Sequence, residues 1–91
     1  MKNELKQVLN DFIALAKTHY DRKGNEYLLE QLEVALDKLE HNVQDEVDEA
    51  RATYQNINTI CLTNHLYLET DEEALLEKIK KFQWVKAGLV A

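Results

Sequence analysis

Residues 64–73, NHLYLETDEE, decide how the helical segments of this sequence are assembled. The stretch begins with an apolar run, has no Gly or Pro beside it, and then becomes strongly acidic. A run this short does not form a stable sheet alone. A membrane-touching loop is the alternative, but the acids of this stretch do not favour it. We therefore predict a corner between two helices, in which Leu66 and Leu68 close the end of a helical bundle. His65 and Tyr67 are expected to point outward from this corner.

The rest of the sequence predicts an all-α protein. It contains no Pro and two Gly, whereas sheet proteins place turn residues about every 8–12 positions. Apolar residues recur instead at steps of three and four, which places them on one face of each helix. This spacing predicts four helices, at about residues 3–18, 26–41, 45–64 and 71–87.

The predicted helix ends carry recognisable start and stop signals. Gly24 can adopt the left-handed conformation, and Asn25 is predicted to cap the helix that follows. Thr70 and Glu73 fit a capping box, with Thr70 at the N-cap position and Glu73 three residues later. Gly88 is the predicted stop of the last helix.

Short connections between helices of similar length predict an antiparallel up-down four-helix bundle. We expect one domain over residues 1–91, because a chain of this length builds a single core. The joint between the second and third helices is very short, so a bent, nearly continuous rod made of these two helices is the alternative.

Composition argues against several classes of protein. The formal net charge of -6 does not suit a nucleic-acid binder, which needs a basic face. The N-terminus lacks the apolar core of a signal peptide. The longest apolar run, residues 12–16, is far shorter than the ~20 residues that span a bilayer. We expect a cytoplasmic protein without stable membrane insertion, and the single Cys61 excludes an internal disulfide.

The sequence offers no set of residues for catalysis, cofactor binding or metal binding. It has no Ser, no Gly-rich phosphate loop and no Glu-x-x-His motif. Its three His fall at helix ends, where an imidazole meets unpaired carbonyl groups. Cys61 lies on the apolar face of the third helix, where a thiol is unreactive. The many carboxylates are expected on outward, solvated faces, so we predict a protein that is not an enzyme.

Charge is distributed unevenly along the chain. Residues 26–49 contain nine acids and the single basic residue Lys38, whereas residues 78–86 contain four Lys and no acid. Trp84 follows Lys80 and Lys81 at helical spacing, so an indole lies among lysines. Such a face suits an interface anchor, although Trp84 folding over a neighbouring helix is an equal alternative. The predicted partner-binding residues are Lys78, Lys80, Lys81, Trp84, Lys86, His65 and Tyr67.

Three consecutive features carry a resemblance to a known family. LLEQLEVALDKLE (28–40), a third helix that ends in Thr63-Asn64, and HLYLETDEEALLEKI (65–79) resemble the immunity proteins for class IIa, pediocin-like bacteriocins. Within that class the enterocin A immunity family is the most similar. The motif is a leucine pattern with one distinctive corner and is not a catalytic signature.

The resemblance implies a function as well as a fold. Such proteins are cytosolic antiparallel four-helix bundles that protect the cell from a small cationic peptide. That peptide turns the membrane component of the mannose phosphotransferase permease into a leak, and the immunity protein acts from inside on the permease–bacteriocin complex. Specificity resides largely in the C-terminal half, which here begins near Tyr54. A small non-enzymatic adaptor or regulatory bundle that uses its acidic second helix is the alternative.

Overall fold

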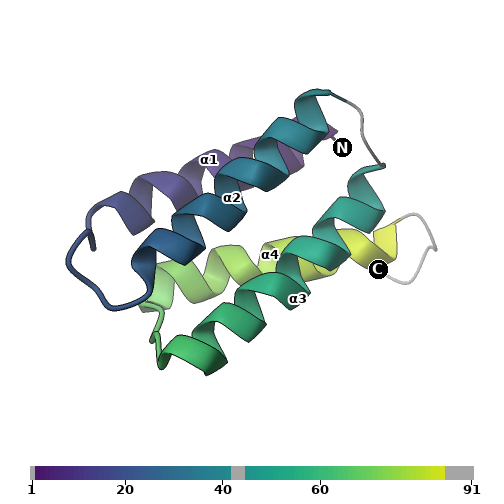
Figure 1. Cartoon of the computed structure of the whole chain (residues 1–91). Helices are drawn as coiled ribbons and strands as arrows, with labels where there is room; N and C mark the ends of the chain where they lie inside the picture. Colours follow the sequence, from purple (N-terminus) through teal and green to yellow (C-terminus); the bar gives the residue numbers. More distant parts are fainter. Residues whose placement is uncertain (1, 42–44, 86–91) are drawn as a thin grey trace.

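A computed structural model describes residues 2–41 and 45–85 of the chain. It contains α1 (Lys2–Lys17), α2 (Asn25–Glu40), α3 (Glu46–Asn64) and α4 (Thr70–Val85). The helices run alternately up and down, and the α1–α2 and α3–α4 connections lie at the same end (Figure 1). The predicted all-α four-helix bundle is confirmed, and each predicted helix corresponds to an observed one.

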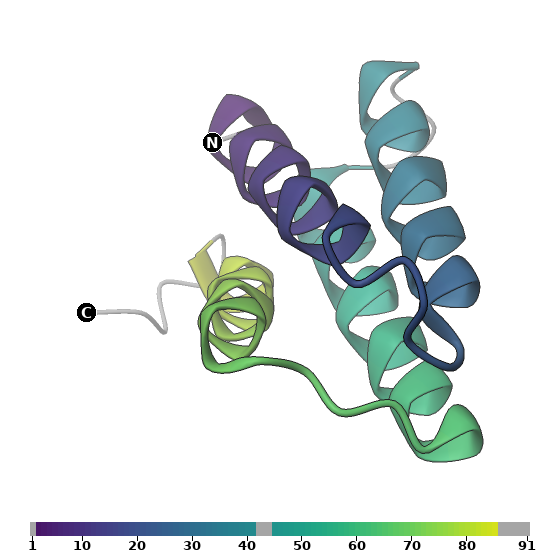
Figure 2. The same ribbon diagram turned by 90° about the vertical axis from the view of Figure 1, so that its left-hand side faces the viewer.

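The four helices close into a ring around one core. α1 packs against α2 and α4, while α3 packs against the same two helices from the other side. The view along the bundle shows this arrangement (Figure 2). Because α2 and α3 are antiparallel neighbours, the alternative of a nearly continuous rod is wrong. Fully buried side chains from all four helices fill the centre, among them Leu9, Phe12, Leu28, Leu32, Ile57 and Ile79.

The α3–α4 connection is the corner that the sequence predicts. Leu66 is buried and Leu68 packs against the core, whereas Tyr67 is 80 % exposed and His65 is exposed. His65 ends α3 in the left-handed conformation with φ 53°, a conformation uncommon for residues other than Gly. The Leu66 amide then donates to the Cys61 carbonyl, which turns the chain toward α4.

Two helix starts differ from the predictions. Gly24 does adopt the left-handed conformation, with φ 81°, but it is itself the N-cap of α2, and no side chain caps this helix. Asn25 is the first residue of α2 and is buried. One half of a capping box forms one residue earlier than predicted, because the Glu69 amide donates to the Glu72 carboxylate at 2.9 Å. Thr70 and Glu73 therefore do not form the box.

Candidate functional site

A shallow groove follows the seam between α3 and α4 at the corner. We call it the α3–α4 groove. Its walls come from the two helices and its end comes from the corner itself. The lining residues are Tyr54, Asn58, Cys61, Leu66, Tyr67, Leu68, Glu73, Leu76 and Glu77.

One of the predicted partner-binding residues, Tyr67, lines the groove, and a second, Lys80, lies beside it. The exposed ring of Tyr67 stands at one end. Toward the other end, the ammonium of Lys80 lies 5.8 Å from the centre of the Tyr54 ring, a distance at which a cation is attracted to the aromatic face. An exposed aromatic ring at one end and a cation beside the other give this groove two features that a protein partner can recognise.

The remaining lysines do not join this groove. Lys78 and Lys81 instead line a second hollow with Phe82, beside Val8 of α1. The structure therefore places Lys80 toward α3, and Lys78 and Lys81 toward α1. Trp84 lies within α4, but its side chain is outside the described part of the structure, and Lys86 lies outside the described residues altogether.

The backbone of the corner is held by a buried ion pair between Arg22 and Glu72. The Arg22 guanidinium donates to both oxygens of the Glu72 carboxylate, at 2.7 and 2.8 Å. It also donates to the carbonyl of Tyr67 at 3.3 Å. Glu72 is fully buried, and a two-pronged Arg–carboxylate pair of this kind fixes geometry as well as charge. The α1–α2 connection thus fixes the backbone that carries the exposed Tyr67 ring.

Asn25 extends the ion pair into a network. Its side-chain oxygen accepts two hydrogen bonds from Arg22, at 2.7 and 3.2 Å, and its amide nitrogen donates to the Ala16 carbonyl at 2.9 Å. In the described part of the chain, every buried side-chain nitrogen or oxygen has a hydrogen-bond partner. The network therefore joins the end of α1 and the start of α2 to the start of α4.

The ion pair shifts the pKa values of both partners. Burial by itself raises the pKa of Glu72, but the hydrogen bonds from Arg22 and from the Glu69 amide outweigh it, so the pKa lies below its ordinary value. The hydrogen bond to Glu72 raises the pKa of Arg22 despite its partial burial. Both groups are therefore charged at neutral pH.

The expectation that all carboxylates face outward is wrong for two residues. Glu49 is 1 % exposed and Glu72 is 0 % exposed. A signal for Glu72 exists in the sequence, because it precedes Ile79 by seven residues and so falls on the inward face of α4. Spacing cannot identify Arg22 as the partner, because the two residues are 50 positions apart and meet only when the bundle closes.

The described residues offer no evident centre for metal or thiol chemistry. No group of three His, Cys, Asp or Glu among residues 2–41 and 45–85 could hold a metal ion. Burial raises the pKa of Cys61, and the opposing effect of Arg22 is smaller. The thiol is therefore protonated and weakly nucleophilic at neutral pH. None of the helices described has both the length and the apolar character needed to cross a bilayer.

Comparisons with known proteins identify no relative. No protein-family model matches the chain, and no curated protein matches it.

Proposed function

We propose that this protein is a cytoplasmic, non-enzymatic immunity protein that protects a cell from a pediocin-like bacteriocin. It would bind, from the cytosol, the mannose phosphotransferase permease carrying the bound peptide, and so block the leak. Two features support the proposal, namely the four-helix fold and the resemblance of residues 28–79 to the enterocin A immunity family.

The α3–α4 groove is the observation that carries this proposal. It lies wholly between Tyr54 and Glu77, in the half of the chain to which the resemblance assigns specificity. Tyr67 exposes a large aromatic ring on backbone that Arg22 holds in place. Rigid, exposed aromatic side chains are typical anchors of protein interfaces. In the proposed mechanism, Tyr67 and Lys80 dock on the cytosolic surface of the permease complex.

The test is protection of a bacteriocin-sensitive strain. Cells that express the chain are challenged with a panel of pediocin-like peptides and compared with cells that carry an empty vector. The proposal predicts resistance to at least one peptide. If cells with verified expression stay fully sensitive to the whole panel, the assignment to this class is wrong.

Variants then locate the site. We expect Tyr67→Ala combined with Lys80→Ala to remove protection while the helical content is unchanged. A second variant, Lys80→Ala with Lys81→Ala and Trp84→Ala, tests the predicted lysine and tryptophan face of α4 separately. The matched control is Tyr20→Ala, which removes an equally exposed ring, 84 % exposed, from the α1–α2 connection. Equal protection by the control and the Tyr67→Ala, Lys80→Ala variant would exclude the groove as the site.

One observation favours the alternative of a small adaptor. The outer surface of α2 exposes both acids and apolar side chains, which an immunity role does not require. Pull-down with and without added bacteriocin separates the two functions. Capture of the permease only in the presence of toxin supports immunity, whereas capture of one other partner regardless of toxin supports the adaptor.

A further inference from the structure

The outer surface of α2 exposes two apolar side chains on the same side of the helix. Tyr27 is 51 % exposed and Val34 is 39 % exposed. They are seven residues apart, which is two helical turns, so they lie one above the other over about 10 Å. Neither is needed to close the core, which α2 reaches through Leu28, Leu32 and Leu39.

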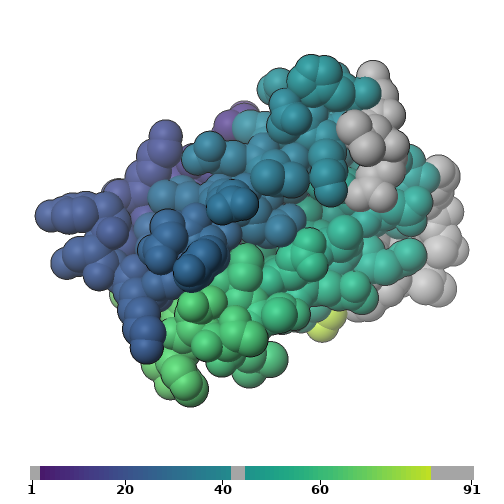
Figure 3. Space-filling view, viewed as in Figure 1, coloured from purple at the N-terminus to yellow at the C-terminus, as the bar shows by residue number. Residues whose placement is uncertain are grey.

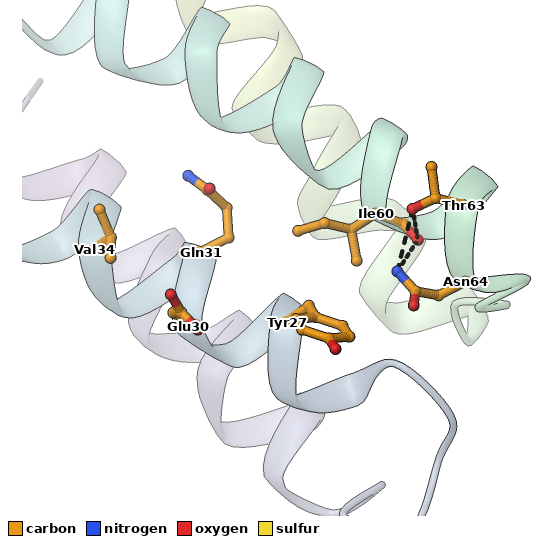
Figure 4. Close-up of a pocket in the computed structure, with 7 residues that line it drawn as sticks. All are labelled: Tyr27, Glu30, Gln31, Val34, Ile60, Thr63 and Asn64. Carbon is orange, nitrogen blue, oxygen red and sulfur yellow. Dashed lines mark hydrogen bonds between the residues drawn. The ribbon is translucent and has the colours of Figure 1, made fainter.

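A hollow lies on each side of this pair. On the α3 side, the seam between the helices is lined by Tyr27, Gln31 and Val34 of α2 together with Ile60 of α3. Figure 4 shows Gln31 and Ile60 directed into the space between the two helices. On the other side, the half-buried Leu29 and the exposed Val34 line a second hollow, together with four acids of α2 and the single cation Lys38. The surface is therefore an apolar ridge between two depressions, and the seam beside it crosses the face seen in Figure 3.

A row of acids accompanies the apolar ridge. The exposed carboxylates follow one another at steps of three and four residues, in the order Glu26, Glu30, Glu33, Asp37 and Glu40. Within the described residues, Glu26, Glu30 and Glu33 have neither a salt bridge nor a hydrogen bond from their side chains. Asp37 pairs only with His41 at the end of the helix.

Glu30 and Glu33, in the middle of this row, make no stabilising side-chain contact with the described residues. Like charges at these spacings repel one another and weaken the helix. A cation brought to the row would relieve the repulsion, and an apolar side chain placed on Val34 or in the seam beside Ile60 would leave water. The negative charge disfavours nucleic acids and anionic lipid surfaces as partners.

We propose that the α2 surface, with the α2–α3 seam beside it, binds a cationic amphipathic helix of another protein. The two turns between Tyr27 and Val34 match a helix that presents apolar anchors at positions i, i+3 or i+4, and i+7. Lysine or arginine side chains beside those anchors would pair with Glu30 and Glu33. This surface lies on a different pair of helices from the α3–α4 groove, so the inference does not depend on the proposed function.

The test titrates the protein with a synthetic helix of Leu and Lys at amphipathic spacing, about 15 residues long. A peptide of the same composition in scrambled order is the control for charge alone. Isothermal titration calorimetry should show saturable binding of the amphipathic peptide that weakens as salt is added. Binding that is equal for the two peptides would overturn the proposal, because it would reflect net charge only.

Two variants separate the apolar and charged contributions. Val34→Ser removes the apolar side chain without changing the charge, and Glu30→Gln with Glu33→Gln keeps the ridge but removes two charges. Each should weaken binding about tenfold, the loss expected for one interface anchor. All three positions are exposed, so the fold should survive, which circular dichroism verifies.

The matched control is Glu73→Gln with Glu77→Gln, which removes two exposed acids from the α3–α4 groove. It should leave the affinity unchanged. An equal loss in this control would place the peptide elsewhere and overturn the proposal. Self-association of the protein alone that the α2 variants abolish would also overturn it, because a second copy would then occupy this surface.

Discussion

Two regions of this bundle use glutamate in opposite ways. At the end where the α1–α2 and α3–α4 connections meet, Glu72 is fully buried and both of its oxygens accept from Arg22. On the outer surface of α2, Glu30 and Glu33 are exposed and have no salt bridge among the described residues. The partners of the buried pair, Arg22 and Glu72, are 50 positions apart in the sequence.

The difference separates charges that hold the fold from charges that are free to bind. A buried carboxylate without its partner is strongly unfavourable, so Glu72 fixes how the two connections meet. An exposed carboxylate is well hydrated and contributes little to folding. Removing charge should therefore destabilise the first region, and it should leave the second intact or slightly more stable.

The largest expected effect follows from breaking the buried pair. Arg22→Ala leaves the Glu72 carboxylate buried without its cation, and we expect it to lower the free energy of unfolding by about 3–5 kcal/mol. Urea denaturation measures this loss. Glu33→Ala is the comparison variant and should change stability by no more than about 0.5 kcal/mol. Losses of similar size for the two variants would remove the distinction between the regions.

The next effect concerns the contact between the α1–α2 connection and the end of α3. A Cβ atom added at Gly24 would lie 2.7 Å from the Cβ of Asn64, and the φ of 81° is unfavourable for other residues. Gly24→Ala should therefore cost at least about 1–2 kcal/mol from backbone conformation alone, with the steric clash in addition. Thermal unfolding measures this cost. Combining Gly24→Ala with Asn64→Gly should recover part of this loss, because the second change removes the contacted Cβ atom. If Gly24→Ala leaves the stability unchanged, the close contact is contradicted.

The pH dependence of stability sharpens the comparison further. The folded pKa of Glu72 lies below its ordinary value. The ionised carboxylate therefore contributes fully to the free energy of unfolding at pH values above the unfolded pKa of about 4.3. This contribution is lost as the pH falls through the lower folded pKa. The stability difference between the original protein and Glu72→Gln should therefore shrink below about pH 4.3. A difference that stays constant or grows on acidification would contradict the assignment.

The smallest expected effect lies on α2. Glu30→Gln with Glu33→Gln removes like-charge repulsion and should raise stability by about 0.2–0.5 kcal/mol for each repulsive pair lost, at low salt. High salt screens exposed charges, so the gain should disappear there. Urea denaturation at the two salt concentrations measures it. Destabilisation at low salt would mean that these acids have favourable interactions within the fold.

The fold was predictable because its determinants are local. The spacing of residues such as Leu28, Leu32 and Leu39 specifies one face of a helix, and all three are buried. The corner was predictable for a related reason, since Leu66 is apolar and lies between two core helices. The start of α4 was misplaced by one residue because Thr70 and Glu73 match the capping-box sequence, whereas in the structure Arg22 holds Glu72 where it accepts from the Glu69 amide.

The candidate site was less predictable because it depends on which helices are neighbours. The exposure of Tyr67 follows from the corner and is confirmed. Helical spacing alone could not show that Lys80 lies against Tyr54 of α3 while Lys78 and Lys81 lie beside α1. The Arg22 network was missed for the same reason, because the loop arginine contacts α4 only in the assembled bundle.

The most direct test of the central claim is a double-mutant cycle between Arg22 and Glu72. The free energies of unfolding of the original protein, Arg22→Ala, Glu72→Ala and the double variant give the coupling energy between the two side chains. If this pair holds the two connections together, the coupling should be about 2–3 kcal/mol, as for close charge pairs at interfaces. A coupling below about 0.5 kcal/mol, typical of exposed pairs, would show that it does not.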